Sequence, residues 1–357
     1  MRETYRSREM TQTDKRRGWG IYVCLSLLLL LASCSTIRFI GIDTLEPSEL
    51  HVPHTVRRVL IVDNAAMPSV APCALTLGKI PLEVKEVTTD SMAFYYCHTL
   101  GERIADAHRY DDVRLYDRAY RPSHLSDQPL SASEVHQLCT DEGADAVISL
   151  DRLQFSIKGD VDLLYFLTHD PLRVEVSGLI RLSIPSDTLT MARTVHLSDT
   201  LRAAFEGTID SPEAISQAMR TVLREVSLYM ADKSSSRFVP HWEPNVRWYY
   251  TSSSSAWKEA SAYAAAEKWK EAAAIWHHLY DQARNWKVKA RLASNIAVSE
   301  ELCGNLSIAS DWAERSYTHY LEYASEVDST TLNRQRRYTE AMKQRLRSDK
   351  ELRGLGK

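Results

Sequence analysis

The stretch RVEVSGLIRLSI, Arg173–Ile184, carries the clearest structural pattern in this chain of 357 residues. Alternate positions place its apolar side chains on one face of an extended chain: Val174, Val176, Ile180, Leu182 and Ile184. Such alternation is typical of an antiparallel strand with one face buried and one in water. Pro185 ends it, and we expect residues 188–197 to pair back as the second strand of a hairpin.

Strands and helices alternate in the residues before this hairpin. Residues 56–64 (VRRVLIVDN) contain a β-branched apolar run closed by Asp-Asn, which predicts a buried strand. Apolar residues then recur three or four positions apart over residues 90–107, which predicts a helix with Asp90 as its N-cap. Residues 113–116 suit a short strand.

Two further helices have recognisable ends. Ser131 and Glu134 have the spacing of a capping box, and Gly143 is a natural helix stop, so we expect a helix between them. After the hairpin, Pro212 stands at a favoured first helical position and opens the last helix of this region. The resulting order, β-α-β-α-β-β-β-α, predicts an α+β or α/β sandwich domain over residues 55–240.

Two segments of this domain resemble a family of small envelope domains. The opening strand contains VLIVDN, residues 59–64, and Gly143 leads into the strand ADAVISLDRL, residues 144–153. Both resemble the small α/β domain of the curli-secretion lipoprotein, of outer-membrane activators of peptidoglycan synthases and of the N-terminal part of TolB. The resemblance implies an envelope protein and transfers no functional residue. The whole chain also resembles uncharacterised lipoproteins with a C-terminal tetratricopeptide-like module.

Residues 256–350 are almost wholly helix-forming and contain an internal repeat. The same steps of three, four and three residues occur in two segments, Trp269, Ala272, Trp276, Leu279 and Leu306, Ala309, Ala313, Ser316. Ala272 and Ala309 are 37 positions apart, near the roughly 34 of a tetratricopeptide repeat. A charged helix over residues 331–347 would close the array. We expect an all-α, tetratricopeptide-like domain, with a plain antiparallel helical bundle as the alternative.

The segment between these domains, residues 241–255, is expected to be a linker, because Pro240 and Pro244 oppose helix formation. Its aromatic side chains are too apolar for a free tether: Trp242, Trp248, Tyr249 and Tyr250. We expect them to pack between the domains. An open aromatic platform for a ligand is the alternative.

The N-terminal residues predict a secretory signal, residues 1–33. The apolar run Ile21–Cys34 (IYVCLSLLLLLASC) follows the basic cluster Lys15-Arg16-Arg17. Its LASC ending resembles the lipobox of bacterial lipoproteins, in which the cysteine, here Cys34, is diacylated and becomes the first mature residue. The alternative is an uncleaved membrane anchor, which needs about 20 apolar residues, more than this run supplies.

An acylated Cys34 would hold the mature chain on a lipid bilayer, with residues 34–54 as an extended tether. Ser35, not aspartate, follows the cysteine, which by resemblance to lipoprotein sorting rules favours the outer membrane. The next residues lack an acidic cluster for export, so we expect a periplasm-facing position, with surface exposure as the second choice.

Composition excludes one class of partner. Residues 1–33 hold six of the 44 basic and three of the 47 acidic residues, so the mature chain carries a formal net charge of −6. This balance lacks the basic footprint of a nucleic-acid-binding protein. The overall proportions, 44% hydrophobic and 25% charged, are those of a globular protein.

The remaining cysteines and histidines carry no recognisable chemistry. Cys73, Cys97, Cys139 and Cys303 are irregularly spaced. We expect buried free thiols, with a Cys73–Cys97 disulfide as the alternative in an oxidising compartment. The histidine pairs at 51 and 54 and at 277 and 278 lack the partners of a metal motif. We therefore expect no metal, no cofactor and no catalytic residues.

The sequence favours a non-enzymatic, outer-membrane lipoprotein that binds an envelope protein or peptide through its helical repeats. Trp269 and Trp276 of the repeats, with Trp242 and Trp248 of the linker, are the candidate binding residues. Two alternatives remain open. One is an envelope hydrolase whose Ser, His and Asp residues assemble from distant positions. The other is a lipoprotein that binds a glycan or small ligand.

Overall fold

The computed structural model describes residues 37–66, 68–120, 128–161, 172–185 and 191–355. The chain divides into two compact units. One unit consists of two separate segments, the chain up to Thr44 and the chain from Trp242 onward. The other unit spans Leu45–His241. The predicted signal segment and the predicted lipidation site, Cys34, lie outside the described residues.

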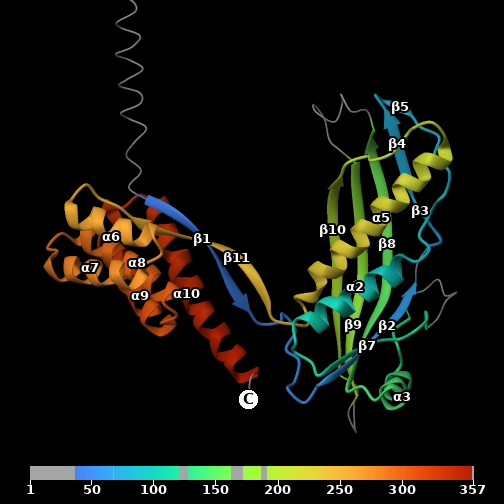
Figure 1. Ribbon diagram of the computed structural model, residues 1–357, viewed down its shortest axis with the longest axis horizontal. Coiled ribbons are helices and arrows are strands. Elements are labelled where there is room, and N and C mark those ends of the chain that lie inside the picture. Colours follow the sequence, from blue (N-terminus) through green and yellow to red (C-terminus); the bar gives the residue numbers. More distant parts are fainter. Residues whose placement is uncertain (1–36, 67, 121–127, 162–171, 186–190, 356–357) are drawn as a thin grey trace, which may run out of the picture. The chain divides into compact units, whose positions relative to one another are not determined.

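The unit Leu45–His241 is built on a mixed β-sheet (Figure 1). Along the sheet the strands follow the order β10-β9-β8-β2-β7, and the short strands β4 and β5 lie beside β8. β2 is parallel to β7 and β8, whereas β8, β9 and β10 form an antiparallel meander. The strands are β2 (Arg58–Ala66), β4 (Cys73–Leu77), β5 (Ile80–Pro81), β7 (Asp112–Leu115), β8 (Ala146–Asp160), β9 (Leu172–Ile184) and β10 (Met191–Ala203).

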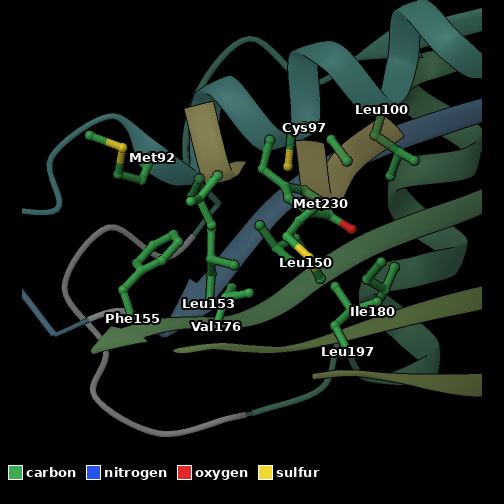
Figure 2. Packing of buried hydrophobic residues seen from close by; sticks show 14 of the residues in the cluster. Met92, Cys97, Leu100, Leu150, Leu153, Phe155, Val176, Ile180, Leu197 and Met230 are labelled. Atoms are coloured by element: carbon green, nitrogen blue, oxygen red, sulfur yellow. The ribbon is translucent and has the colours of Figure 1, made fainter. Parts of the chain in front are cut away.

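Two neighbouring helices, α2 (Met92–Asp106) and α5 (Pro212–Ser235), cover one face of this sheet. Figure 2 shows the apolar side chains that meet there: Met92, Cys97 and Leu100 of α2, Met230 of α5, and Leu150, Leu153, Phe155, Val176, Ile180 and Leu197 of the strands. These residues belong to a single hydrophobic core. Its burial supplies the main stabilisation of the unit.

The helix α3 (Ala132–Glu142) packs on the opposite face. Ile61 belongs to the core under α2 and α5, whereas its neighbours Leu60 and Val62 pack with Val135 of α3. Because consecutive side chains of a strand point to opposite faces, α3 must cover the second face of β2. Burial on both faces explains why β2 is apolar without interruption.

The predicted order of strands and helices is confirmed in this unit. Ser131 and Glu134 form the reciprocal hydrogen bonds of a capping box, and Gly143 ends α3 at a φ of 66°. Pro212 is the first residue of α5. Asp90 was the wrong N-cap for α2: the turn that precedes this helix makes Ser91 the cap residue, with a φ of 69° and no side-chain capping bond.

Four short strands escaped prediction. β4 and β5 extend the sheet, and β3 (Val70–Ala71) pairs with β6 (Val87–Thr88). β3, β5 and β6 have two residues each, too few for an alternating pattern, and the nearby prolines, Pro72 and Pro81, are typical of loops. β8 also runs beyond the predicted end at Leu153 to Asp160.

The second unit contains five consecutive α-helices in its C-terminal part. Each helix packs against the next one in sequence (Figure 1). They are α6 (Ser255–Ala265), α7 (Trp269–Gln282), α8 (Trp286–Leu302), α9 (Leu306–Glu322) and α10 (Ser329–Leu355), with a short 3-10 turn, η1 (Ala324–Glu326), before the last. The prediction of an all-helical C-terminal region is confirmed.

The predicted tether and linker are both strands, which corrects two expectations. β1 (Ile37–Glu46) pairs with β11 (His241–Tyr250) in a two-stranded sheet. Thr44 lies at this pairing, where its hydroxyl accepts a hydrogen bond from the Asn245 amide at 2.8 Å. Two prolines exclude a helix but not an edge strand, and strand pairing between residues about two hundred positions apart leaves no local pattern.

The described cysteines are free thiols, with Cys97 and Cys139 buried and Cys73 and Cys303 half-buried. The structure thus has no Cys73–Cys97 disulfide. Burial raises the pKa of Cys73 and of Cys139 to about 11, so both stay protonated at neutral pH. None of the helices within the described ranges is long and apolar enough to span a bilayer.

Candidate functional site

The C-terminal half of β11 is inserted among the helices of its unit. Arg247, Trp248, Tyr249 and Tyr250 are each at most 8% exposed. Since neighbouring side chains of a strand point to opposite sides, burial of all four means that helices cover both sides of this inserted segment, Arg247–Tyr250. The first half of β11 differs: Trp242 is 67% exposed.

Aromatic contacts hold the inserted segment against three helices. The ring of Tyr249 lies 6.2 Å from Trp269 and 5.9 Å from Trp276, both on α7. Trp248 meets Tyr338 of α10 edge to face, with ring centroids 5.3 Å apart. The hydroxyl of Tyr320, on α9, hydrogen-bonds the hydroxyl of Tyr250 at 3.3 Å. Trp248, Tyr249, Tyr250, Trp276 and Tyr338 belong to one hydrophobic cluster, and Trp269 borders it.

Asn295 of α8 binds the main chain of the inserted segment. Its side-chain oxygen accepts the Tyr250 N–H at 2.7 Å, and its amide nitrogen donates to the Tyr250 carbonyl at 2.8 Å. Asn295 is fully buried. One side chain thus satisfies both polar groups of a buried residue, as a neighbouring strand would. This contact recognises the main chain and so does not depend on the side chain of Tyr250.

A buried carboxylate anchors the other end of the segment. Glu301 of α8, 1% exposed, accepts two hydrogen bonds from Arg247 Nε and Nη2, at 2.9 Å each. Arg345 of α10 also donates to this carboxylate. The Tyr338 hydroxyl donates to it at 3.1 Å, and burial beside this charge raises the pKa of Tyr338 well above its usual value, so the donor proton is kept. Two guanidinium groups and a phenol compensate the buried charge.

The structure places the four candidate tryptophans differently from what we expected. Trp276 is fully buried, Trp248 is 8% exposed and Trp269 is half-buried, and all three lie in or against the same cluster. Trp242 stays outside this cluster, on the exposed half of β11. The aromatic residues therefore form the core of the helical unit. Trp248, Trp269 and Trp276 belong to this core or border it, so these three do not form an open platform.

The residues that bind the inserted segment were missed by the sequence analysis: Asn295, Glu301, Tyr320, Tyr338 and Arg345. Each lies on a helix with an ordinary polar or aromatic pattern, so no local signal marked it. The sequence held one signal for two of them: α8 has ten buried residues, and the polar Asn295 and Glu301 occur among its apolar positions. Asn295 and Glu301 are six positions apart and serve the two ends of one segment.

A second group of aromatic residues lies half-buried between α7 and α9. This α7–α9 patch comprises His277, Tyr280, Trp312, Arg315 and His319. Trp312 meets the rings of His277 and Tyr280 edge to face at 5.0 and 4.9 Å, and the Arg315 guanidinium lies 4.5 Å from its ring centroid. Tyr280 hydrogen-bonds His319 at 3.0 Å. Burial lowers the pKa of His319, so its ring is neutral at pH 7.

The other unit contains a buried polar cluster around Asp151 of β8. Its carboxylate accepts hydrogen bonds from Asn64 at 2.7 Å, Ser149 at 3.0 Å and Arg181 at 2.5 Å. Burial raises the pKa of Asp151, against the effect of these donors. The cluster ties β2, β8 and β9 together. In this cluster the Ser149 hydroxyl donates to Asp151, and the other described donors to this carboxylate are Asn64 and Arg181.

No arrangement of three or more His, Cys, Asp or Glu side chains suited to a metal occurs within the described ranges. His277 pairs instead with Glu300 at 3.6 Å, and His278 with Gln282 at 2.9 Å. The described polar clusters consist of ion pairs and hydrogen bonds.

Two family models match the chain, and the boundary between them lies near the boundary of the two structural units. Residues 56–250 match a family described as a domain of unknown function, DUF8603, and this region is more than half of the chain. The chain belongs to the DUF8603 family. Residues 258–344 match a second domain of unknown function, DUF6340, which spans most of the helical region. The DUF8603 region ends at Tyr250, so it includes the inserted segment, which packs in the helical unit.

No curated protein matches the chain. A solved structure titled "Crystal structure of uncharacterized protein" is similar to it over 50% of this chain and 90% of that one, with 15% sequence identity and a TM-score of 0.23. A likeness at this score carries no argument about fold or function.

Proposed function

We propose that this DUF8603 protein is a non-enzymatic lipoprotein of the outer membrane that holds a partner protein at the periplasmic face. Cys34 carries the lipid in this proposal, and the helical unit carries the partner site. The observation that supports it best is the inserted segment. It shows that the helices of this unit can hold an extended chain through its main chain, as Asn295 does for Tyr250.

A tetratricopeptide-like arrangement of α6 to α9 agrees with this proposal. Ala272 and Ala309, the equivalent positions of the two sequence repeats, are both fully buried. Small residues at these positions let paired helices approach closely. Two helix pairs followed by the polar helix α10 would make a short array with a cap.

A partner needs a surface other than the one that β11 occupies. The α7–α9 patch supplies it, since aromatic side chains and arginine are enriched where proteins meet. Arg315 lies over Trp312, and Lys289 lies 5.4 Å from the Tyr280 ring centroid. This combination of rings and cations favours a partner segment that bears acidic side chains.

The lipid anchor is proposed to lie next to the helical unit. β1 begins at Ile37, only three residues after Cys34, and belongs to this unit up to Thr44. Three residues of chain reach at most about 11 Å. The acyl chains would therefore keep the helical unit within a short distance of the bilayer.

Fractionation tests the anchor. We expect the full chain to stay with membranes after a carbonate wash and the Cys34→Ser variant to be released, because one serine cannot carry acyl chains. Ser35→Ala serves as the matched control and should stay membrane-bound. Retention of Cys34→Ser would contradict the lipoprotein proposal and support an uncleaved anchor.

A photoreactive residue at position 277, on the patch, tests the partner site in intact cells. Leu321, 48% exposed on α9, is the control position. We expect adducts with an envelope protein from position 277 only, and their loss when Arg315→Glu is added. Equal adducts from both positions, or turnover of a substrate by the purified protein without any adduct, would argue against a binding protein.

A further inference from the structure

The strand β10 forms an outer edge of the sheet in the unit Leu45–His241. It is 13 residues long and ends the strand order, so within the described residues only β9 pairs with it (Figure 1). It contains neither proline nor lysine, the residues that commonly block pairing at an edge. A long strand with an open edge is a template for another strand.

The N–H and C=O groups of odd- and even-numbered residues of β10 point to opposite edges of the strand. The Thr200 N–H donates to the Asp199 carboxylate at 2.8 Å, and from this bond we infer that it points away from β9. Because every second residue of a strand directs its N–H and C=O to the same side, the even-numbered residues present theirs to the open edge. His196 and Ser198 are among them, and their side chains are exposed.

A groove of about 460 Å³ accompanies this edge where β10 approaches α5. Leu201 and Ala203 of the strand and Ala218 and Val222 of the helix line it. Tyr229, 47% exposed, also lines it, together with the charged Arg202, Glu206 and Glu225. An added strand would bring side chains near the apolar part of this surface.

We propose that a second copy of this chain occupies the edge, pairing β10 with β10 in antiparallel orientation about a twofold axis through His196. The sequence of β10 is complementary to itself in this register. Arg193 comes opposite Asp199 of the second copy, and Val195 comes opposite Leu197 of the second copy. Symmetry repeats both contacts. The two sheets become one continuous sheet across the dimer.

This register agrees with the faces of the strand. Val195 and Leu197 both lie on the side of the core, so their cross-copy contact extends that core. Asp199 already pairs with Lys233 of α5 at 2.6 Å, which keeps it ionised and ready to meet a guanidinium of the second copy. The proposal goes beyond the lipid anchor and the partner site and does not depend on either.

Disulfide trapping in the purified full chain under a mild oxidant tests the register. A hydrogen-bonded pair at 196 places two Cα atoms about 5.5 Å apart, within the range of a disulfide. We expect His196→Cys to shift the protein to a dimer band that a reductant reverses. Thr200→Cys alone should stay monomeric, because two copies of position 200 lie about 27 Å apart. Ala192→Cys with Thr200→Cys should form the dimer again, since these positions are opposite.

Charge exchange supplies the second test. In the His196→Cys background, Arg193→Asp should abolish trapping, because two carboxylates then face each other. Adding Asp199→Arg should restore it. The wild-type chain, with its own four described cysteines, is the baseline. A monomeric His196→Cys protein, or equal trapping at positions 196 and 200, would overturn the proposal; the first result would also follow if a different protein covered the edge.

Discussion

Asn295 has a structural importance that its residue type does not suggest. It lies fully buried in the middle of α8 and binds both polar groups of the Tyr250 main chain. An amide in a helix interior is neutral to unfavourable for the helix itself. Its place there is explained only by the strand that it holds, and this strand in turn completes the aromatic core.

Asn295→Ala should therefore destabilise the helical unit by about 2–4 kcal/mol, because it leaves two buried main-chain groups without partners. Denaturant unfolding measures the change. Asn305→Ala is the matched control: the exposed Asn305 side chain donates to the Glu300 carboxylate, so its loss should cost less than about 0.5 kcal/mol. Equal effects of the two substitutions would mean that Asn295 does not hold β11.

Asp145 shows how a single carboxylate makes stability depend on pH. It accepts hydrogen bonds from the Arg58 side chain and from the main-chain N–H groups of Arg57 and Arg58. The Arg58 side chain contributes most to lowering the pKa of Asp145 below 3.8. Because the pKa of Asp145 is lower in the folded than in the unfolded protein, its interactions stabilise the fold at pH values above the pKa of the unfolded state. This stabilisation is lost as the pH falls through the pKa of the folded state.

The Asp145→Asn variant should accordingly be less stable than the wild-type chain at pH 7, and the difference should shrink below about pH 4. Urea unfolding at pH 7, 5 and 3 gives the comparison. Asp106→Asn, at an exposed position 3.8 Å from Arg103, should change little at any pH. A difference for Asp145→Asn that stays constant down to pH 3 would contradict this linkage.

At the scale of the element, β10 is a long strand that pairs with β9 along one edge. From the Thr200–Asp199 hydrogen bond we infer that its odd-numbered main-chain groups pair with β9 and that the even-numbered ones face outward. The order of elements around it was predictable, because alternation in residues 173–184 and the periodicity of the helices are local patterns. The sequence pattern did not predict that β8 pairs with β9 on the side away from β10, because the order in which strands pair depends on the whole sheet.

A proline scan distinguishes the two edges of β10. Leu197→Pro removes a donor to β9 and should destabilise the unit by about 3 kcal/mol or more, whereas Ser198→Pro removes only an outward N–H and should cost much less. Thermal unfolding of both variants measures this. If Ser198→Pro were as damaging as Leu197→Pro, the outer edge would not be open in the way described.

At the scale of the molecule, the helical unit is completed by residues from both ends of the chain. Ile37 and Ile40 of β1 pack against the aromatic cluster around Trp276. Phe39, between them, is 64% exposed. The segment that was expected to be a tether therefore stabilises the unit that follows it by two hundred residues.

Replacing Ile37 and Ile40 by serine should destabilise the helical unit by about 1–3 kcal/mol through lost apolar burial. Hydrogen exchange measured along the chain should show faster exchange in α7 to α10 and unchanged exchange in β2, β8 and β9. Phe39→Ser is the control and should leave both regions unchanged. Faster exchange confined to the α/β unit would contradict the prediction, because it would mean that β1 does not stabilise the helical unit.

The candidate binding residues show the limit of inference from local patterns. Trp269 and Trp276 were chosen because they repeat at helical spacing, and the same spacing places them in the core, where Tyr249 covers them. Sequence reasoning had no means to tell an open groove from one filled by the chain itself. The occupant comes from a segment that two prolines had marked as a linker.

By itself, the sequence determined the succession of strands and helices, the capping box at Ser131, the end of α3 at Gly143 and the helical nature of residues 256–350. All of these depend on side chains within a few positions of one another. Only the tertiary structure decided that β1 joins β11, that the aromatic segment is inserted among the helices, and that Asn295 and Glu301 hold its two ends. These contacts join residues far apart in the chain, and their stability comes from burial that exists only once both partners are in place.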